Sequence, residues 1–309
     1  MLIYFIENNT QTIHNKFKET YPELPIKSLD EQNINQIKNG DMLYYSFSNL
    51  VKLNYVYRYC KAHNILLCVS SSITDDVLQQ FCYNHSILLN VVKKINSEAI
   101  TNIYNCFRKL LEKSVYVVGK ASFYEKKTIH NLFSKICFIK CPCIYDKKYS
   151  HEYNSSKYIC AVTPDFLNCK EFKRTHNLKN IYICYLQYKK YGKLYKDKRD
   201  NLYKKYLTTH NISNLRTLIN TSECEYGYDV AKLEQGWMST GVLTLFYFSK
   251  IFEHIYVDGF SHFDDNGSPI IPSGKLCNPY NNRGGFHSNE FEHHVLTNII
   301  KENGNIFCM

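Results

Sequence analysis

Short apolar runs alternate with helical patterns along the first ninety residues, and few folds accommodate that rhythm. Strand-like runs occupy residues 2–7, 42–46, 65–69 and 87–91. Helical spacing of apolar side chains occurs through Ile13, Phe17 and Tyr21, and again over residues 50–62 and 75–83. Strands that alternate with helices predict a parallel sheet covered on both faces. No glycine-rich phosphate loop follows these strands, which favours a structural or acceptor-side domain over a nucleotide site.

The same alternation resumes after one long helical pattern. Residues 97–113 place apolar side chains on a single stripe, so we expect a helix that connects two domains. Further strand-like runs lie at residues 114–118, 136–140, 158–162 and 181–185. The sequence therefore predicts an α/β protein with a smaller N-terminal α/β domain at residues 1–95, a linking helix at 96–113, and a Rossmann-like parallel sheet with helices on both faces at 114–309.

Charge is concentrated in one segment. The chain has 38 Lys and Arg against 28 Asp and Glu, a net charge of +10, which favours an anionic partner. Residues 188–206 contain eight basic and two acidic side chains, so this Lys and Tyr segment alone carries +6. It is either an anion-binding surface or a solvated helix face, and the solvated face is the simpler interpretation. Because the rest of the chain carries only +4, nucleic acid is not the expected partner.

Cysteine usage and hydropathy bear on the compartment. Thirteen cysteines at irregular spacings make a poor disulfide framework, which predicts reduced thiols in a cytoplasmic protein. Cys141 and Cys143 are the one close pair, and no second pair or histidine partner at zinc spacing accompanies them. The first apolar run is too short for a signal peptide, and no run is long enough to span a membrane.

The stretch from residue 236 to 260 combines capping residues with a long apolar run. Ser239 and Thr240 are typical N-cap residues, Gly241 permits close backbone approach, and residues 242–252 fit a buried helix. A strand at residues 254–257 follows. The free N–H groups of such a helix could bind phosphate or carboxylate, although an ordinarily capped core helix is the commoner case.

Downstream, a histidine precedes another helical pattern. His287 follows two glycines, and Glu292 stands five positions later at the start of a helix. A histidine at that place can act as a general base, because its ordinary pKa is close to neutrality. Glu292 could orient the histidine or stabilise the helix N-terminus. The adjacent His293 and His294 raise the alternatives of a metal site or exposed polar side chains, but their spacing is not that of a zinc helix.

These two stretches together resemble motifs of the eukaryotic-type sialyltransferases, glycosyltransferase family 29. The run from Ser239 to Gly241, with its apolar helix and strand, resembles that family's small sialyl motif. His287 and Glu292 resemble its very small motif. The strand at residues 115–118 with the glycine after it resembles the start of its large motif, except that Lys120 stands where the family usually has Asn. The resemblance covers about residues 114–309.

The resemblance implies a GT-A-like catalytic domain that transfers sialic acid, with inversion, from CMP-sialic acid to a glycan or glycolipid hydroxyl. It implies His287 as the catalytic base, Glu292 as its support, and no metal or further cofactor. The donor-binding residues that it implies, with two placed only by their position between the motifs, are Gly119, Lys120, Ser122, Ser239, Thr240, Gly241, His262 and Tyr280.

Two alternatives stay open on the residues alone. Lys120 in place of Asn favours a transferase or hydrolase that uses another nucleotide sugar. The Lys and Tyr segment favours a polyanion- or carbohydrate-binding module, or a peripheral attachment to anionic membrane.

Overall fold

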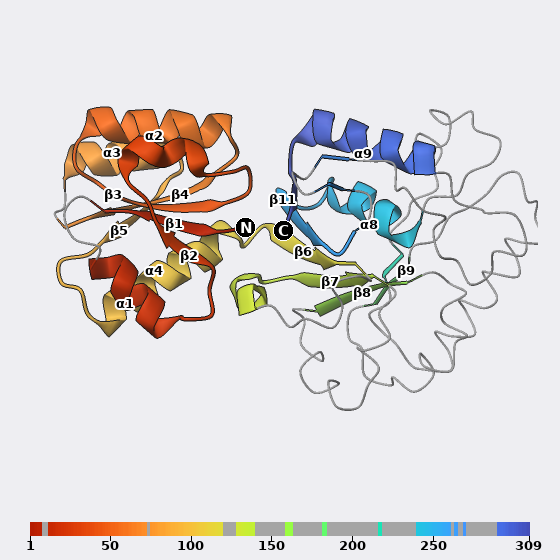
Figure 1. Cartoon of the computed structure of the whole chain (residues 1–309), viewed down its shortest axis with the longest axis horizontal. Coiled ribbons are helices and arrows are strands. Elements are labelled where there is room, and N and C mark those ends of the chain that lie inside the picture. Colours follow the sequence, from red (N-terminus) through yellow and green to blue (C-terminus); the bar gives the residue numbers. More distant parts are fainter. Residues whose placement is uncertain are drawn as a thin grey trace, which may run out of the picture. The chain divides into compact units, whose positions relative to one another are not determined.

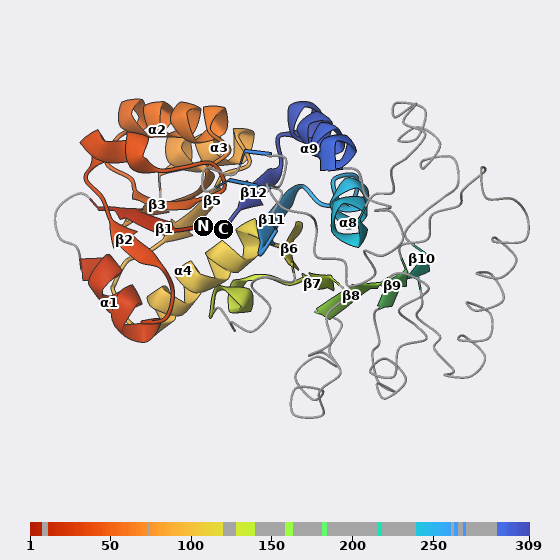
Figure 2. The same cartoon turned by 45° about the vertical axis from the view of Figure 1, so that its right-hand side comes forward.

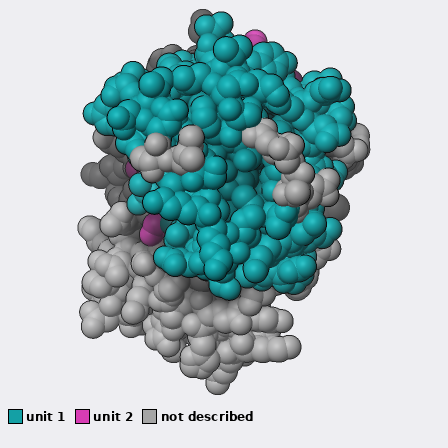
Figure 3. Space-filling model, turned by 90° about the vertical axis from the view of Figure 1, so that its left-hand side faces the viewer, with its two compact units in different colours: residues 1–113, 126–134 teal, residues 114–125, 135–309 magenta. Residues whose placement is uncertain are grey.

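The computed structural model describes residues 1–7, 12–72, 75–119, 128–139, 158–162, 181–183, 216–217, 239–260, 263–264, 268–269 and 289–309. The chain divides into two compact units. Unit 1 comprises Met1–Lys113 and Lys126–Ser134, and unit 2 comprises Ser114–Glu125 and Lys135–Met309. Figure 3 distinguishes the two units by colour, with unit 1 in teal. Neither the Lys and Tyr segment nor the Cys141 and Cys143 pair lies within the described residues.

Unit 1 is a five-stranded, wholly parallel sheet with strand order β2-β1-β3-β4-β5. Helices α2 and α3 cover one face of this sheet, and α1 and α4 cover the other (Figure 1). Its elements are β1 (Ile3–Ile6), α1 (Thr12–Thr20), β2 (Ile26–Ser28), η1 (Glu31–Gln36), β3 (Met42–Ser46), α2 (Leu50–Ala62), β4 (Leu66–Ser71), α3 (Asp76–Asn84), β5 (Leu88–Val91), α4 (Ser97–Leu110) and η3 (Thr128–Leu132).

Local side chains fix where the helices of unit 1 begin. Asn49, Asp75 and Asn96 stand directly before α2, α3 and α4, and each side chain accepts hydrogen bonds from N–H groups in the first turn. These caps satisfy donors that have no partner within a helix. The boundaries predicted from the sequence agree with α2, α3 and α4 to within three residues at either end.

Helix α4 belongs to unit 1. Its buried side chains Ile100, Ile103 and Phe107 face the sheet, and the helix contacts β4, β5 and α1. The ring of Phe107 packs edge-on against Phe5 of β1. The sequence correctly predicted the apolar stripe, but the stripe covers one face of the first sheet, and the helix we expected to link two domains is therefore part of the first one.

Unit 2 contains a seven-stranded sheet with order β10-β9-β8-β7-β6-β11-β12, again parallel at every pairing. Figure 2 shows the strands from β6 to β10 in succession. Its described elements are β6 (Ser114–Val118), β7 (Ile136–Ile139), β8 (Tyr158–Val162), β9 (Ile181–Ile183), β10 (Arg216–Thr217), α8 (Thr240–Phe248), β11 (His254–Asp258), α9 (Asn289–Asn303) and β12 (Ile306–Cys308).

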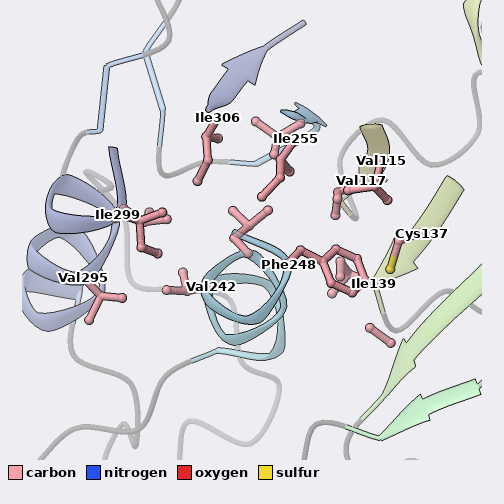
Figure 4. Packing of buried hydrophobic residues seen from close by; sticks show 14 residues of the cluster. Val115, Val117, Cys137, Ile139, Val242, Phe248, Ile255, Val295, Ile299 and Ile306 are labelled. Atoms are coloured by element: carbon pink, nitrogen blue, oxygen red, sulfur yellow. The ribbon is translucent and has the colours of Figure 1, made fainter. Parts of the chain in front are cut away.

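The core of unit 2 lies between this sheet and helices α8 and α9. In Figure 4, Val242 and Phe248 of α8 lie between α9 and the strand residues Val117 and Ile255. All four side chains are fully or almost fully buried. The apolar run predicted as a buried helix is thus buried against both the sheet and α9.

The predicted fold class, parallel α/β sheets with flanking helices and a Rossmann-like sheet in the second half, is confirmed. Strands β2, β10 and β12 were missed, because two or three residues are too few to establish a period. Within the described residues, no helix is both long enough and apolar enough to cross a bilayer.

Candidate functional site

The strand order of unit 2 reverses between β6 and β11. From β6 the sheet extends through β7, β8, β9 and β10 in one direction, whereas β11 and β12 lie on the other side of β6. Successive connections therefore diverge at the carboxyl ends of β6 and β11. In open α/β sheets ligands bind at such a topological switch point, which makes this edge the first place to look for a site.

At this edge the backbones of the two strands approach closely. The Gly119 N–H, directly after β6, donates to the Asp258 carbonyl of β11 at 2.6 Å. A Cβ atom added to Gly119 would lie 2.8 Å from the carbonyl carbon of Gly259 and 2.9 Å from the ring of Phe260. Only glycine fits here, since the obstacle is backbone as well as side chain.

The N-terminus of α8 reaches the same place. A Cβ atom added to Gly241, in the first turn of α8, would lie 2.8 Å from the Phe260 ring. Phe260 therefore contacts both Gly119 and Gly241, and three segments that are distant in sequence meet around it. The Gly259 backbone and the Phe260 ring thus fill the space that side chains would need at these two buried glycines.

A carboxylate from α9 already occupies part of the α8 N-terminus. Glu292 is fully buried. One of its oxygens accepts from the backbone N–H of Ser239, and the other accepts from the Ser239 hydroxyl at 3.1 Å. Ser239 is the N-cap of α8, and its hydroxyl oxygen in turn accepts from the Val242 N–H at 3.3 Å. The chain thus places its own anion at the positive end of the helix.

This arrangement changes the role expected for Ser239. The family resemblance implied that Ser239 binds the nucleotide-sugar donor, whereas its N–H and its hydroxyl bind Glu292. Glu292 belongs to the first turn of α9, so the N-termini of α8 and α9 meet through this carboxylate. Its observed role is to stabilise the N-terminus of α8, whereas the role considered from the sequence concerned the N-terminus of its own helix, α9.

A buried tyrosine and aspartate lie beside the glycines. The Tyr116 hydroxyl of β6 donates to the Asp258 carboxylate at the end of β11 at 2.8 Å. Burial, and then the Asp258 charge, raise the pKa of Tyr116, so the phenol stays protonated as the donor. Burial, followed by the charges of Asp264 and Asp258, raises the pKa of the nearby Cys308 thiol to about 12.

The structure describes some of the predicted site residues and not others. It brings together Gly119, Ser239, Gly241 and Glu292 at one edge of the unit 2 sheet. Thr240 is the first residue of α8, and its side chain is not among those described. The predicted residues that lie outside the described part of the chain are Lys120, Ser122, His262, Tyr280 and His287.

Three residues of this edge were not singled out from the sequence. Gly259 and Phe260 entered only as the end of the strand in the run that resembles the small sialyl motif, and Tyr116 only as part of the strand at residues 115–118. The position of Phe260, directly after a buried strand and a glycine, was the available signal, because loops at the carboxyl ends of parallel strands line ligand sites. Among the described residues, no cluster of three His, Cys, Asp or Glu side chains is arranged to hold a metal ion.

Comparison with known proteins does not identify the chain. The sequence matches no protein-family model, and no curated protein matches it. Among solved structures the chain is similar to a D-lactate dehydrogenase from Aquifex aeolicus complexed with NAD and lactic acid, with 10% identity, 99% of this chain and 87% of that chain covered, and a TM-score of 0.21. A likeness at that level does not bear on function.

These findings correct one expectation from the sequence. The motif resemblance placed the C-terminal region with the sialyltransferases, yet no model of that or any other family matches. The matching motifs are short, and the Ser-Thr-Gly run also fits an ordinary helix N-terminus. Ser239 is in fact the N-cap of α8. The assignment to glycosyltransferase family 29 is therefore wrong, and any function must rest on the site itself.

Proposed function

We propose that the chain is a glycosyltransferase that binds a nucleotide-linked sugar at the carboxyl edge of β6 and β11. The observation that carries this proposal is the convergence of Gly119, Gly241 and Phe260 at the topological switch point of unit 2. In open α/β sheets, nucleotides and other ligands bind at such a point, outside the carboxyl ends of the strands.

The loop after β6 favours a mononucleotide over a dinucleotide. Dinucleotide-binding loops carry three glycines in the order G-x-G-x-x-G directly after the first strand. Here Gly119 is followed by Lys120, Ala121 and Ser122, so only the first glycine is present. A positive lysine at that position suits the phosphate of a mononucleotide donor.

His287 is the proposed general base. It stands two residues before α9, whose first turn brings Glu292 to the α8 N-terminus. In an inverting transfer the base removes the proton of the acceptor hydroxyl as the nucleotide leaves through an oxocarbenium-like transition state. The leaving phosphate gains negative charge, which a cation such as Lys120 would stabilise. CMP-sialic acid is the donor to test first. The proposed donor thus carries sialic acid as its sugar and cytosine as its base.

Ligand binding is the first test. We expect CMP, at about 100 times its Kd, to stabilise the folded chain by about 2.7 kcal/mol in thermal unfolding. UDP, GDP and NAD, each at the same concentration, are the comparison ligands. Stabilisation by UDP or GDP alone would move the proposal to another nucleotide sugar. Stabilisation by NAD alone would overturn it, as would binding only to polyanions with a steep salt dependence.

Turnover is the second test. With CMP-sialic acid and a mixture of glycan acceptors, His287→Ala should lower the rate of CMP release by about 10²–10⁴-fold. His294→Ala is the matched control, because His294 is an exposed residue of α9 that contacts Asn298. Both variants should bind CMP as the wild type does. Unchanged turnover in His287→Ala would remove this residue from the base role.

A further inference from the structure

Two cysteines of unit 1 lie on elements that pack against one another. Cys68 lies in β4 and is fully buried, whereas Cys106 lies in α4 and is partly exposed. Helix α4 packs against β4, and each of the two thiols is the largest influence on the pKa of the other. Both cysteines lie in unit 1, so they are not part of the site proposed at β6 and β11 of unit 2.

The fold itself brings the two thiols together. Cys68 is in register with Tyr44 of β3, which is in register with Phe5 of β1, so the three side chains share one face of the sheet. Helix α4 covers that face, since Phe107 packs against Phe5. Cys106 directly precedes Phe107, and α4 contacts β4. Packed elements on both sides therefore hold the pair in place.

The two thiols are not equivalent. The hydrogen bond donated by Cys68 lowers the pKa of Cys106, and Lys109, one turn further along α4, also lowers it against the opposing effect of burial. The same hydrogen bond, together with burial, raises the pKa of Cys68. Burial alone raises the pKa of Cys82 to about 11 and is the main cause that raises the pKa of Cys60 to about 12. Among these four thiols, Cys106 combines partial exposure with the greatest thiolate character.

We propose that Cys106 is a hydroperoxide-reactive thiol and that Cys68 resolves it into a reversible disulfide between α4 and β4. The Cys106 thiolate attacks one oxygen of the hydroperoxide O–O bond, which breaks and leaves as hydroxide or alkoxide, and Cys106 becomes a sulfenic acid. The Cys68 sulfur then attacks the Cys106 sulfur, the S–O bond breaks, and water leaves with the Cys68 proton. The two thiols are oxidised by two electrons, and the hydroperoxide is reduced.

The first experiment maps the bond in the full folded chain. Hydrogen peroxide is added to the reduced protein, remaining thiols are alkylated, and peptides are identified by mass spectrometry before and after reduction with dithiothreitol. We expect one peptide pair joined through Cys68 and Cys106, with Cys60 and Cys82 alkylated as free thiols. A chain in which Cys106 stays reduced while Cys60 or Cys82 is oxidised would overturn the proposal.

The second experiment separates the two steps. Cys68→Ala should leave a sulfenic acid at Cys106 that dimedone traps, whereas the wild type should show little trapping because Cys68 removes it. Cys60→Ala is the matched control and should behave as the wild type. Equal trapping in the wild type and in Cys68→Ala would show that Cys68 does not resolve Cys106.

A third experiment compares the alkylation rates of two thiols in the unsubstituted chain. Iodoacetamide in limiting amount should alkylate Cys106 of the native protein at neutral pH at least about tenfold faster than Cys82, because the thiolate is the nucleophile. In denaturant the two rates should become equal. Equal rates in the native protein would contradict the proposal.

Discussion

The two sheets of this chain differ in how the helix N-terminus beside the reversal of strand order is satisfied. In unit 1 the strand order reverses between β1 and β3, and in unit 2 it reverses between β6 and β11. A helix begins near each reversal, and in both cases a glutamate of the chain occupies its N-terminus. Glu7 accepts from the N–H groups of Ile13 and His14 in α1, while Glu292 binds Ser239 at α8.

The two units differ in the sequence separation between the glutamate and the helix N-terminus that it binds. Glu7 directly follows β1 and reaches a helix that starts five residues later. Glu292 lies 53 residues beyond Ser239. The strand ends also differ, because Glu7 and Phe47 follow β1 and β3, whereas Gly119 and Gly259 follow β6 and β11. In unit 1, a glutamate close in sequence therefore satisfies the helix N-terminus, and side chains follow both strands. In unit 2, glycines follow the strands, and the glutamate comes from the distant helix α9.

The largest expected effect concerns the close approach of the buried Gly119 to the Gly259 backbone. Gly119→Ala should lower the free energy of unfolding by about 3 kcal/mol, because its methyl group would meet the Gly259 backbone. Gly241→Ala should cost only about 1 kcal/mol, since the obstacle is the Phe260 side chain, which can rotate. Denaturant unfolding of both variants measures the difference. Equal losses would show that β6 and β11 do not approach as closely as described.

The second prediction compares the two glutamates directly. Glu292→Ala should cost about 3 kcal/mol, because it leaves the Ser239 N–H and hydroxyl unpaired beside a fully buried site. Glu7→Ala should cost about 1 kcal/mol, since Glu7 is only half-buried and water can replace it. Chemical denaturation of each variant tests the order. A double-mutant cycle of Glu292→Ala with Ser239→Ala should show coupling, and additive losses would contradict the contact.

The same contrast explains what the sequence could predict. Helix α2 and strands β3 and β6 were placed correctly, because apolar spacing and caps such as Asn49 act over a few residues. Gly119, Gly241 and Ser239 at the unit 2 edge were also named as candidate site residues. The bond from Glu292 to Ser239 and the meeting of Gly119 with Gly259 depend on strand order, which a single sequence does not encode in any local pattern. Ser239 was consequently assigned to a ligand instead of to the chain.

The third prediction compares two buried tyrosines, one at the centre of each sheet. Tyr116→Phe should cost about 2 kcal/mol, because the buried Asp258 carboxylate loses a hydrogen-bond donor. Tyr44→Phe in unit 1 should change stability by no more than about 0.5 kcal/mol. The Tyr44 hydroxyl lies near Ser70, but among the described residues it completes no hydrogen bond. Thermal unfolding measures both, and a larger loss for Tyr44→Phe would reverse the comparison.

The smallest effect is a pH dependence confined to unit 2. Burial lowers the pKa of His254 at the start of β11, and the charge of Glu253 partly opposes this. Below the ordinary histidine pKa of about 6.5 the unfolded chain binds a proton that the folded chain resists. This site therefore makes the free energy of unfolding fall as the pH drops from 6.5 towards the lowered pKa, and it contributes no slope well above 6.5. His254→Gln should flatten that part of the profile, and Glu253→Gln should steepen it, because the folded pKa falls further once the opposing charge is removed. Urea unfolding between pH 5 and pH 7.5 measures the slopes, and equal slopes for the wild type and His254→Gln would mean that the buried imidazole does not contribute.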